Sequence, residues 1–79
     1  MKLSEYLKAE RKKRCLKQAE MCKKIGVNRS TYCTYEKGWI NPKRQKKVRP
    51  SLATAKRIAK FTGASVEYIA ELIDNEERE

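Results

Sequence analysis

Glycine sets the strongest limits on how this chain can fold. Each of its three glycines, Gly26, Gly38 and Gly63, directly follows a stretch in which apolar residues recur at helical spacing. A glycine in that place is typical of a helix C-terminus, where the backbone adopts a positive φ. The chain is therefore predicted to be all-α, a compact five-helix bundle over residues 1–73. The expected helices run from about Ser4 to Arg14, from Gln18 to Lys24 and from Asn28 to Lys37, and two more begin at Ser51 and Ser65.

The apolar residues of these segments predict one modest core. With 79 residues, of which 39% are hydrophobic, the chain has enough apolar material for a single domain. Trp39 is expected to cover this core or, alternatively, to hold the loop that follows it. Tyr68 and Leu72 fit either bundle packing or a dimer contact, and the charged tail 74–79 is expected to fray. The positions predicted to face inward are Leu3, Leu7, the stem of Arg11, Met21, Cys22, Ile25, Tyr32, Tyr35, Leu52, Ala55, Ile58, Ala59, Val66, Ile69, Ala70 and Ile73.

Charge is distributed unevenly along the chain. Twenty Lys and Arg residues against ten Asp and Glu give a net charge of +10. Residues 1–60 contain 19 basic and 4 acidic side chains, whereas residues 61–79 contain 1 basic and 6 acidic ones. A positive field of this size attracts a polyanion, and the binding of phosphates releases condensed counterions. Nucleic acid is therefore the leading predicted partner, and a basic surface that only keeps the protein in solution is the alternative.

Other classes of function find little support in the sequence. The chain has no histidine, and its three cysteines form no CxxC pair, so we expect no disulfide, no metal site and no cofactor. A phosphate-binding glycine loop and paired carboxylates are also missing, so no catalytic residue is predicted. No apolar run reaches the roughly 18 residues of a membrane span, and the start does not resemble a signal peptide, so a cytoplasmic protein is expected.

The segment between residues 16 and 38 carries a specific motif. It reads LKQAEMCKKIGVNRSTYCTYEKG. This segment closely resembles the Xre or Cro/lambda-repressor-like helix-turn-helix family, whose pattern is LSQxxLAxxLGVSxxxIxxYExG. The resemblance continues through Pro50, Leu52, Ile58, Gly63 and Ile69, and so covers about residues 3–73. It implies a lambda-repressor-like DNA-binding domain in which the second and third helices form the motif and the third enters the major groove of double-stranded DNA.

One side of the predicted third helix is small, polar and basic. Arg29, Ser30, Cys33, Thr34 and Lys37 share this side by their helical spacing, independently of the resemblance. The resemblance implies that Arg29, Ser30 and Thr34 read bases. The Arg29 guanidinium fits guanine, worth ~1 to 3 kcal/mol of discrimination, whereas Thr34 offers a methyl group to thymine or a hydroxyl to a base edge. The predicted phosphate ligands are Gln18, Asn28, Lys37, Lys43, Arg44, Lys46, Lys47 and Arg49.

Further positions match or depart from the family pattern. Arg11 and Glu36 match an ion pair that links the first helix to the recognition helix and orients it without reading bases. Gln18 would also support a recognition-helix side chain. Lys17 stands where the family has a hydroxyl cap, so fraying is expected in the first turn of the second helix. Residues 43–50 resemble an insertion into a shorter loop, expected on phosphate, with a solvated loop or a minor-groove arm as alternatives.

The resemblance implies a transcriptional regulator of the phage or mobile-element repressor type. Such proteins usually bind as homodimers to palindromic half-sites about one helical turn apart. An antitoxin or adaptor that meets another protein through the acidic last helix, and that also binds DNA, is the alternative. An RNA-binding module fits the charge as well, but RNA readers usually present stacking aromatics on a sheet or loop, and this pattern has neither.

Overall fold

The five helices predicted from the sequence are all present. The computed structural model describes residues 1–39 and 49–78, and this part of the chain contains five α-helices and no strand. The all-α fold class is therefore confirmed, and most helix ends lie within one residue of their predicted positions. The helices are α1 (Leu3–Lys13), α2 (Gln18–Ile25), α3 (Arg29–Lys37), α4 (Leu52–Thr62) and α5 (Val66–Glu77).

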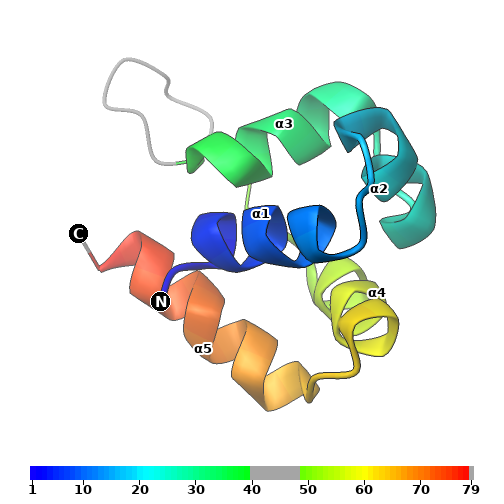
Figure 1. The fold of residues 1–79 in the computed structure, drawn as a ribbon. Helices are drawn as coiled ribbons and strands as arrows, with labels where there is room; N and C mark the ends of the chain where they lie inside the picture. Colours follow the sequence, from blue (N-terminus) through cyan, green and yellow to red (C-terminus); the bar gives the residue numbers. More distant parts are fainter. Residues whose placement is uncertain (40–48, 79) are drawn as a thin grey trace.

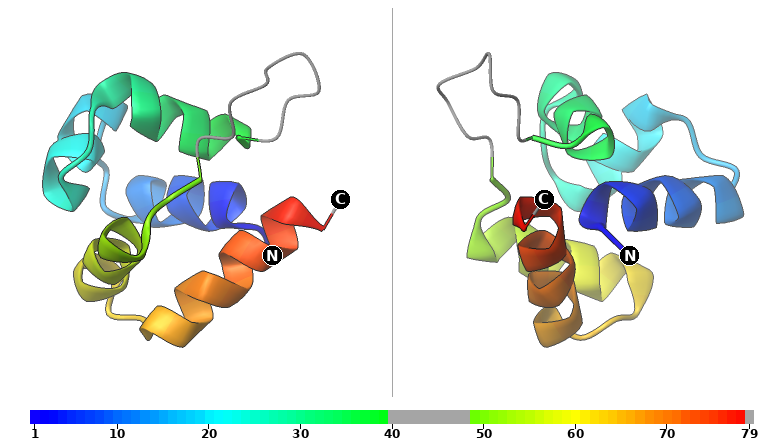
Figure 2. Two further views of the ribbon diagram at one scale, coloured as in Figure 1. Left: turned by 180° about the vertical axis from the view of Figure 1, so that it is seen from behind. Right: turned by 90° about the vertical axis from the view of Figure 1, so that its left-hand side faces the viewer.

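Helix α1 lies at the centre of the bundle. It packs against α3 on one side and against α5 on the other, while α2 contacts both α3 and α4 (Figure 1). The views from behind and from the side show α4 and α5 on the opposite side of α1 from α3 (Figure 2). In the part of the chain that the structure describes, no helix lies over the outer side of α3. The arrangement therefore leaves one long side of the third helix open to a partner.

The ends of the helices follow local sequence. Helix α2 ends at Gly26 and α4 ends at Gly63, both in the left-handed conformation with φ of 71° and 79°. A β-carbon in that conformation costs roughly 1–2 kcal/mol, which explains why glycine stands there. At the starts of α4 and α5, the hydroxyl oxygens of Ser51 and Ser65 accept backbone N–H groups at 3.2 and 3.1 Å. These serines therefore cap the two helices that were expected to begin at them.

The starts of α2 and α3 lack a side-chain cap of this kind. Lys17 precedes α2 and offers no side-chain acceptor, but the Glu20 carboxylate accepts the Lys17 backbone N–H at 3.2 Å. This contact supplies one half of a capping box, and α2 begins at its expected residue, Gln18. Asn28 precedes α3, yet its side chain accepts no N–H group of the helix. The exposed Asn28 side chain is therefore not used as a cap.

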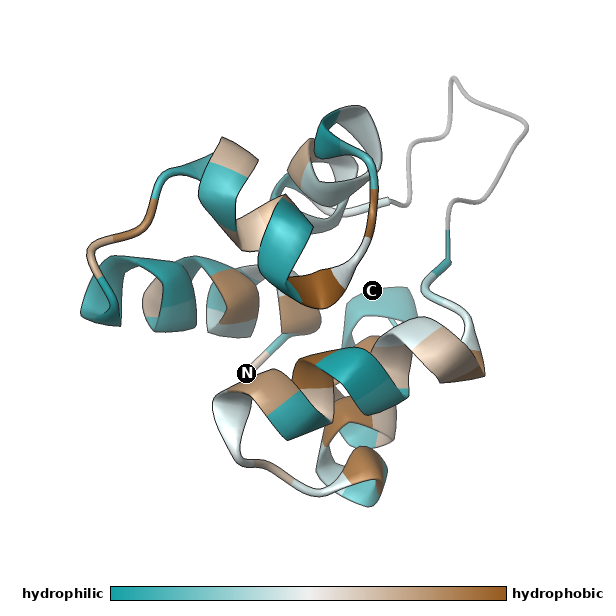
Figure 3. Ribbon diagram, turned by 90° about the vertical axis from the view of Figure 1, so that its right-hand side faces the viewer, coloured by the Kyte–Doolittle hydropathy of each residue, from teal (hydrophilic) through white to brown (hydrophobic). Residues whose placement is uncertain are grey.

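The core draws residues from the inner sides of all five helices. Figure 3 shows hydrophobic residues interspersed among hydrophilic ones in the helical part of the ribbon. Trp39 is only 2% exposed and packs edge-to-face on Tyr35, with ring centroids 6.2 Å apart, so the prediction that it covers the core is confirmed. Tyr6 is also buried, which helical spacing did not predict. The predicted core positions confirmed as buried are Leu3, Leu7, Met21, Cys22, Ile25, Tyr32, Tyr35, Ala55, Ile58, Ala59, Ile69 and Ile73.

Two of the predicted core positions are wrong. Leu52 is 66% exposed, because it is the first residue of α4 and no described segment packs over its side chain. Ala70 is exposed as well, whereas Leu72 is buried to 2% exposure. The buried side of α5 therefore includes Leu72 in place of the predicted Ala70. Leu72 belongs to bundle packing and not to a dimer contact, while Tyr68 is 40% exposed and stacks edge-to-face on Tyr6.

The end of the chain is more ordered than expected. Residues 74–77 were predicted to fray, but they form the last turn of α5. Glu76 is buried, and its carboxylate accepts the backbone N–H of Ser4 at 3.0 Å. The Asn75 amide nitrogen donates to the carbonyl oxygen of Met1 at 2.9 Å. Contacts to the start of the chain, which lie far away in sequence, therefore hold this charged turn in place.

Candidate nucleic-acid interface

A short turn sets the angle between α2 and α3. Gly26 follows α2, the half-buried Val27 packs against the core, and Asn28 directly precedes α3. The Arg57 guanidinium of α4 donates to the carbonyl oxygen of Gly26 at 3.2 Å. A β-carbon on Gly26 would lie 3.0 Å from a nitrogen of that guanidinium, in addition to straining the backbone. Arg57 therefore anchors this turn to the rest of the bundle.

Helix α3 presents two different sides. Tyr32, Tyr35 and Glu36 are buried against the bundle, which confirms the predicted inward position of the two tyrosines. On the outer side, Arg29, Ser30 and Lys37 are exposed, and Cys33 and Thr34 are half-buried. The structure thus brings the three predicted base-reading residues onto the open side of the helix.

Thr34 makes a contact inside its own helix. Its hydroxyl group donates to the carbonyl oxygen of Ser30 at 3.0 Å, one turn earlier. A threonine hydroxyl has a single hydrogen, so this contact occupies its only donor. Of the two roles considered for Thr34, contact of its methyl group with a thymine methyl agrees better with this geometry than donation to a base edge.

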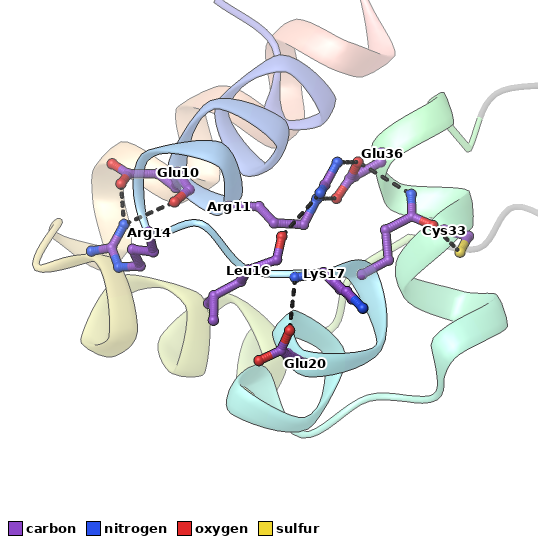
Figure 4. A network of polar contacts seen from close by, with 9 residues as sticks. Glu10, Arg11, Arg14, Leu16, Lys17, Glu20, Cys33 and Glu36 are labelled. Atoms are coloured by element: carbon purple, nitrogen blue, oxygen red, sulfur yellow. Dashed lines mark hydrogen bonds and ion pairs between the residues drawn. The ribbon is translucent and has the colours of Figure 1, made fainter.

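A buried carboxylate joins the first three helices. The Arg11 guanidinium forks onto Glu36 with N···O distances of 2.7 and 3.2 Å, and a third nitrogen donates to the Leu16 carbonyl oxygen at 3.1 Å. Figure 4 shows Arg11 and Glu36 pointing toward one another between α1 and α3. The side chain of Glu36 is only 2% exposed and that of Arg11 is 18% exposed. The ion pair expected from the family pattern is thus present in the structure.

The surroundings of Glu36 keep it ionised. Burial acts to raise the pKa of Glu36, but the hydrogen bonds from Arg11 and Gln18 and the charge of Arg11 outweigh burial and lower it below its ordinary value. Burial, reinforced by the nearby Glu36 carboxylate, raises the pKa of Tyr32, so this phenol stays neutral. A charged Glu36 therefore holds α1 and α2 to the recognition helix.

Gln18 is the first residue of α2 and lies beside α3. Its amide nitrogen donates to a Glu36 carboxylate oxygen at 3.4 Å, and its amide oxygen accepts from the Cys33 thiol at 3.2 Å. The family pattern implied that Gln18 supports a recognition-helix side chain, but it did not indicate Cys33 as the partner. Fifteen residues separate the two. Helical spacing is informative only within one helix, so it could not have revealed this contact.

Apart from Gln18, the predicted phosphate ligands fall into three groups. Asn28 and Lys37 are exposed at the two ends of α3. Arg49 forms ion pairs with Asp74 at 3.9 Å and Glu77 at 3.4 Å, although its side chain remains 57% exposed. A phosphate that bound Arg49 would have to compete with these carboxylates. The remaining four positions lie outside the described residues; they are Lys43, Arg44, Lys46 and Lys47.

Features of other functional classes are few in the described ranges. No group of three or more His, Cys, Asp or Glu residues is placed to hold a metal ion among residues 1–39 and 49–78. The cysteines are unpaired, with Cys15 exposed, Cys22 buried and Cys33 half-buried. Over the same ranges, no helix is long and apolar enough to cross a membrane.

Comparisons with known proteins agree with this geometry. A family model described as helix-turn-helix matches residues 7–69. A protein of Vibrio cholerae described as the cryptic phage CTXphi transcriptional repressor RstR is 38% identical over 74 residues, which cover 94% of this chain and 57% of the relative. The chain thus matches little more than half of that repressor's length. No solved structure matched.

Proposed function

The chain belongs to the helix-turn-helix family of the Xre or lambda-repressor-like type. We therefore propose that it is a transcriptional repressor that binds double-stranded DNA at a specific sequence. The open polar side of α3 carries this proposal. It combines two exposed residues at the helix start, Arg29 and Ser30, with Thr34 one turn later. A side of this kind fits the major groove, where donors and acceptors distinguish all four base pairs.

The assigned roles follow from the chemistry of each side chain. Arg29 would read guanine through its planar fork, Thr34 would meet a thymine methyl group, and Ser30 would contact a base edge. Lys37 and Asn28, exposed at the ends of α3, would bind the flanking phosphates. The basic residues of segment 43–49 would add further phosphate contacts. The protein would act without catalysis, by occupying its site.

We further propose that two copies bind together. Two-fold dimers of such domains place their recognition helices in successive major grooves, so the operator would be a palindrome with half-sites about one helical turn apart. The repressor activity is extended to this chain from the phage repressor, because the similarity between the two covers 94% of this chain.

Selection of bound duplexes from a random pool, followed by sequencing, tests the proposal. We expect an enriched palindrome that the protein binds in preference to random duplex, with affinity that falls as salt rises. Enrichment without any common sequence would show a general polyanion binder and would contradict the proposed function.

Variants then separate base reading from phosphate binding. Arg29→Ala should relax the preference at one base pair per half-site, whereas Arg78→Ala, at the exposed end of α5, should change nothing. Substitution of four cations of segment 43–47 by Gln should weaken binding to all duplexes alike and flatten the salt dependence. If Arg29→Ala weakened every duplex equally, its role would be phosphate binding and the base-reading assignment would be wrong. The four substituted cations are Lys43, Arg44, Lys46 and Lys47.

A further inference from the structure

The two ends of the Gln18 amide have different neighbours on α3. The amide nitrogen faces Glu36, with 3.4 Å between nitrogen and carboxylate oxygen. The amide oxygen faces Cys33, with 3.2 Å between oxygen and sulfur. Both Gln18 and Cys33 are half-buried, at the edge between the interior of the bundle and the open side of α3. This amide is thus held between two partners on the same neighbouring helix.

Chemistry allows only one orientation of this amide. Glu36 is ionised and fixed by the Arg11 fork, so it presents only acceptors to Gln18. If the amide were flipped, its oxygen would face a carboxylate oxygen, which is repulsive. The nitrogen must therefore point to Glu36, and the oxygen must point to Cys33. A thiol can donate one hydrogen bond, so Cys33 satisfies the amide oxygen.

This orientation leaves one amide hydrogen unused. The Gln18 nitrogen carries two hydrogens, and only one of them can point at Glu36. The other belongs to a half-buried group at the start of α2, beside the open side of α3. We propose that Cys33 is a positioning residue, whose thiol holds the Gln18 amide so that its second N–H is directed to a DNA phosphate oxygen. This inference rests on the proposed function.

The effect of the thiol is on the torsion that turns the amide. The last torsion of a glutamine side chain has a broad, two-fold preference, so the amide plane is easily rotated. With Cys33 in place, both ends of the amide are fixed. Without it, the oxygen loses its partner and the second N–H points at the phosphate for only part of the time. A single hydrogen bond of this kind changes affinity by about two- to tenfold.

A double-mutant cycle on the selected duplex tests the inference. Cys33→Ala should lower the affinity of the full-length chain by about two- to tenfold, and Gln18→Ala should lower it at least as much. In the double variant, Cys33→Ala should cause no further loss, because its effect passes through Gln18. Cys33→Ser keeps a donor at this position and should restore binding. Cys15→Ala, at an exposed cysteine, is the matched control and should leave affinity unchanged.

The salt dependence separates this effect from a general loss of charge or structure. Gln18 is neutral, so its contact with a phosphate displaces no counterion when the protein binds. Loss of this contact should therefore leave the slope of log affinity against log salt the same in all variants. Thermal unfolding should show that each variant is folded at the assay temperature. A merely structural role of Cys33 would lower the unfolding temperature and give no rescue by serine.

Three results would overturn the inference. Additive losses in the cycle, unchanged affinity of Cys33→Ala, or failure of Cys33→Ser to restore binding would each show that the thiol does not position Gln18. These results leave the proposed function standing, because the wild-type chain would still select its duplex. If the wild-type chain selected no duplex, the proposed function itself would fail and the inference with it.

Discussion

Glu36 is the residue on which the geometry of the interface most depends. Its carboxylate lies on the inner side of α3, yet it receives hydrogen bonds from Arg11 of α1 and Gln18 of α2. Removing one partner of a buried ion pair leaves the other charge buried and unpaired, which is costly. A single side chain on the inner face of the recognition helix thereby fixes where the outer face lies.

Replacing Arg11 tests this orienting role. We expect Arg11→Ala to lower the free energy of unfolding by about 3 kcal/mol, since it leaves the Glu36 carboxylate buried without its main partner. Urea denaturation measures the change, with Arg78→Ala as an exposed control. The sequence selected from random duplexes should stay the same. An altered preference at unchanged stability would contradict a purely orienting role.

The low pKa of Glu36 predicts a pH dependence of stability. In the unfolded chain, Glu36 titrates near its ordinary value of 4.5, whereas in the folded protein its pKa is lower. Its contribution to stability is therefore fully present above pH 4.5 and is lost as the pH falls through the lowered value. Glu36→Gln cannot titrate, so its stability should fall less steeply than that of the wild type on acidification. Parallel curves of unfolding free energy against pH would contradict this.

At the scale of single helices, the caps explain where each element begins and ends. Ser51 and Ser65 start α4 and α5 with hydroxyl caps, and α2 lacks such a cap at Lys17. The backbone of Lys17 already has the extended conformation of a cap residue, with φ of −83° and ψ of 161°. Glu20 already accepts the Lys17 N–H group, so half of a capping box is in place.

A hydroxyl at position 17 should therefore stabilise the protein. We expect Lys17→Ser to raise the free energy of unfolding by about 0.5–1 kcal/mol, because the new side chain can accept an N–H group in the first turn of α2. Lys17→Ala removes the same charge without adding an acceptor and is the matched control. Equal stability of the two variants in urea denaturation would show that the missing cap is not what limits α2.

At the scale of the whole molecule, the two ends of the chain depend on each other. The buried Glu76 carboxylate accepts an N–H group in the first turn of α1, where the helix dipole favours a negative charge. One of its oxygens also lies 3.2 Å from where a β-carbon on Gly38 would be. Glu76 thus brings the ends of α1, α3 and α5 together.

A protein partner on the acidic α5 stays a prediction, as does a dimer.

Loss of this carboxylate should be felt throughout the bundle. Glu76→Ala should lower the free energy of unfolding by about 2 kcal/mol, since a buried hydrogen bond to a charged group is lost. Glu71→Ala, at an exposed position of the same helix, should stay within about 0.5 kcal/mol of the wild type. Equal effects of the two substitutions would mean that the last turn of α5 frays in solution, as the sequence alone suggested.

The sequence by itself determined the five helices, their glycine and serine ends and the polar outer side of α3. Each of these depends on residues within one or two helical turns, and spacing and capping chemistry report directly on that range. The base-reading and phosphate-binding roles stay predictions, because they concern DNA and not the free protein.

Only the tertiary structure decided which long-range partners meet. The exposure of Leu52, the burial of Leu72 and the Gln18–Cys33 contact depend on how separate helices are placed against one another. Arg49 likewise faces the carboxylates of α5, which its place in a basic segment did not suggest. Periodicity gives the side of a helix that is apolar, but it does not say where the opposing helix ends or which polar group faces which. That information exists only once the helices have packed.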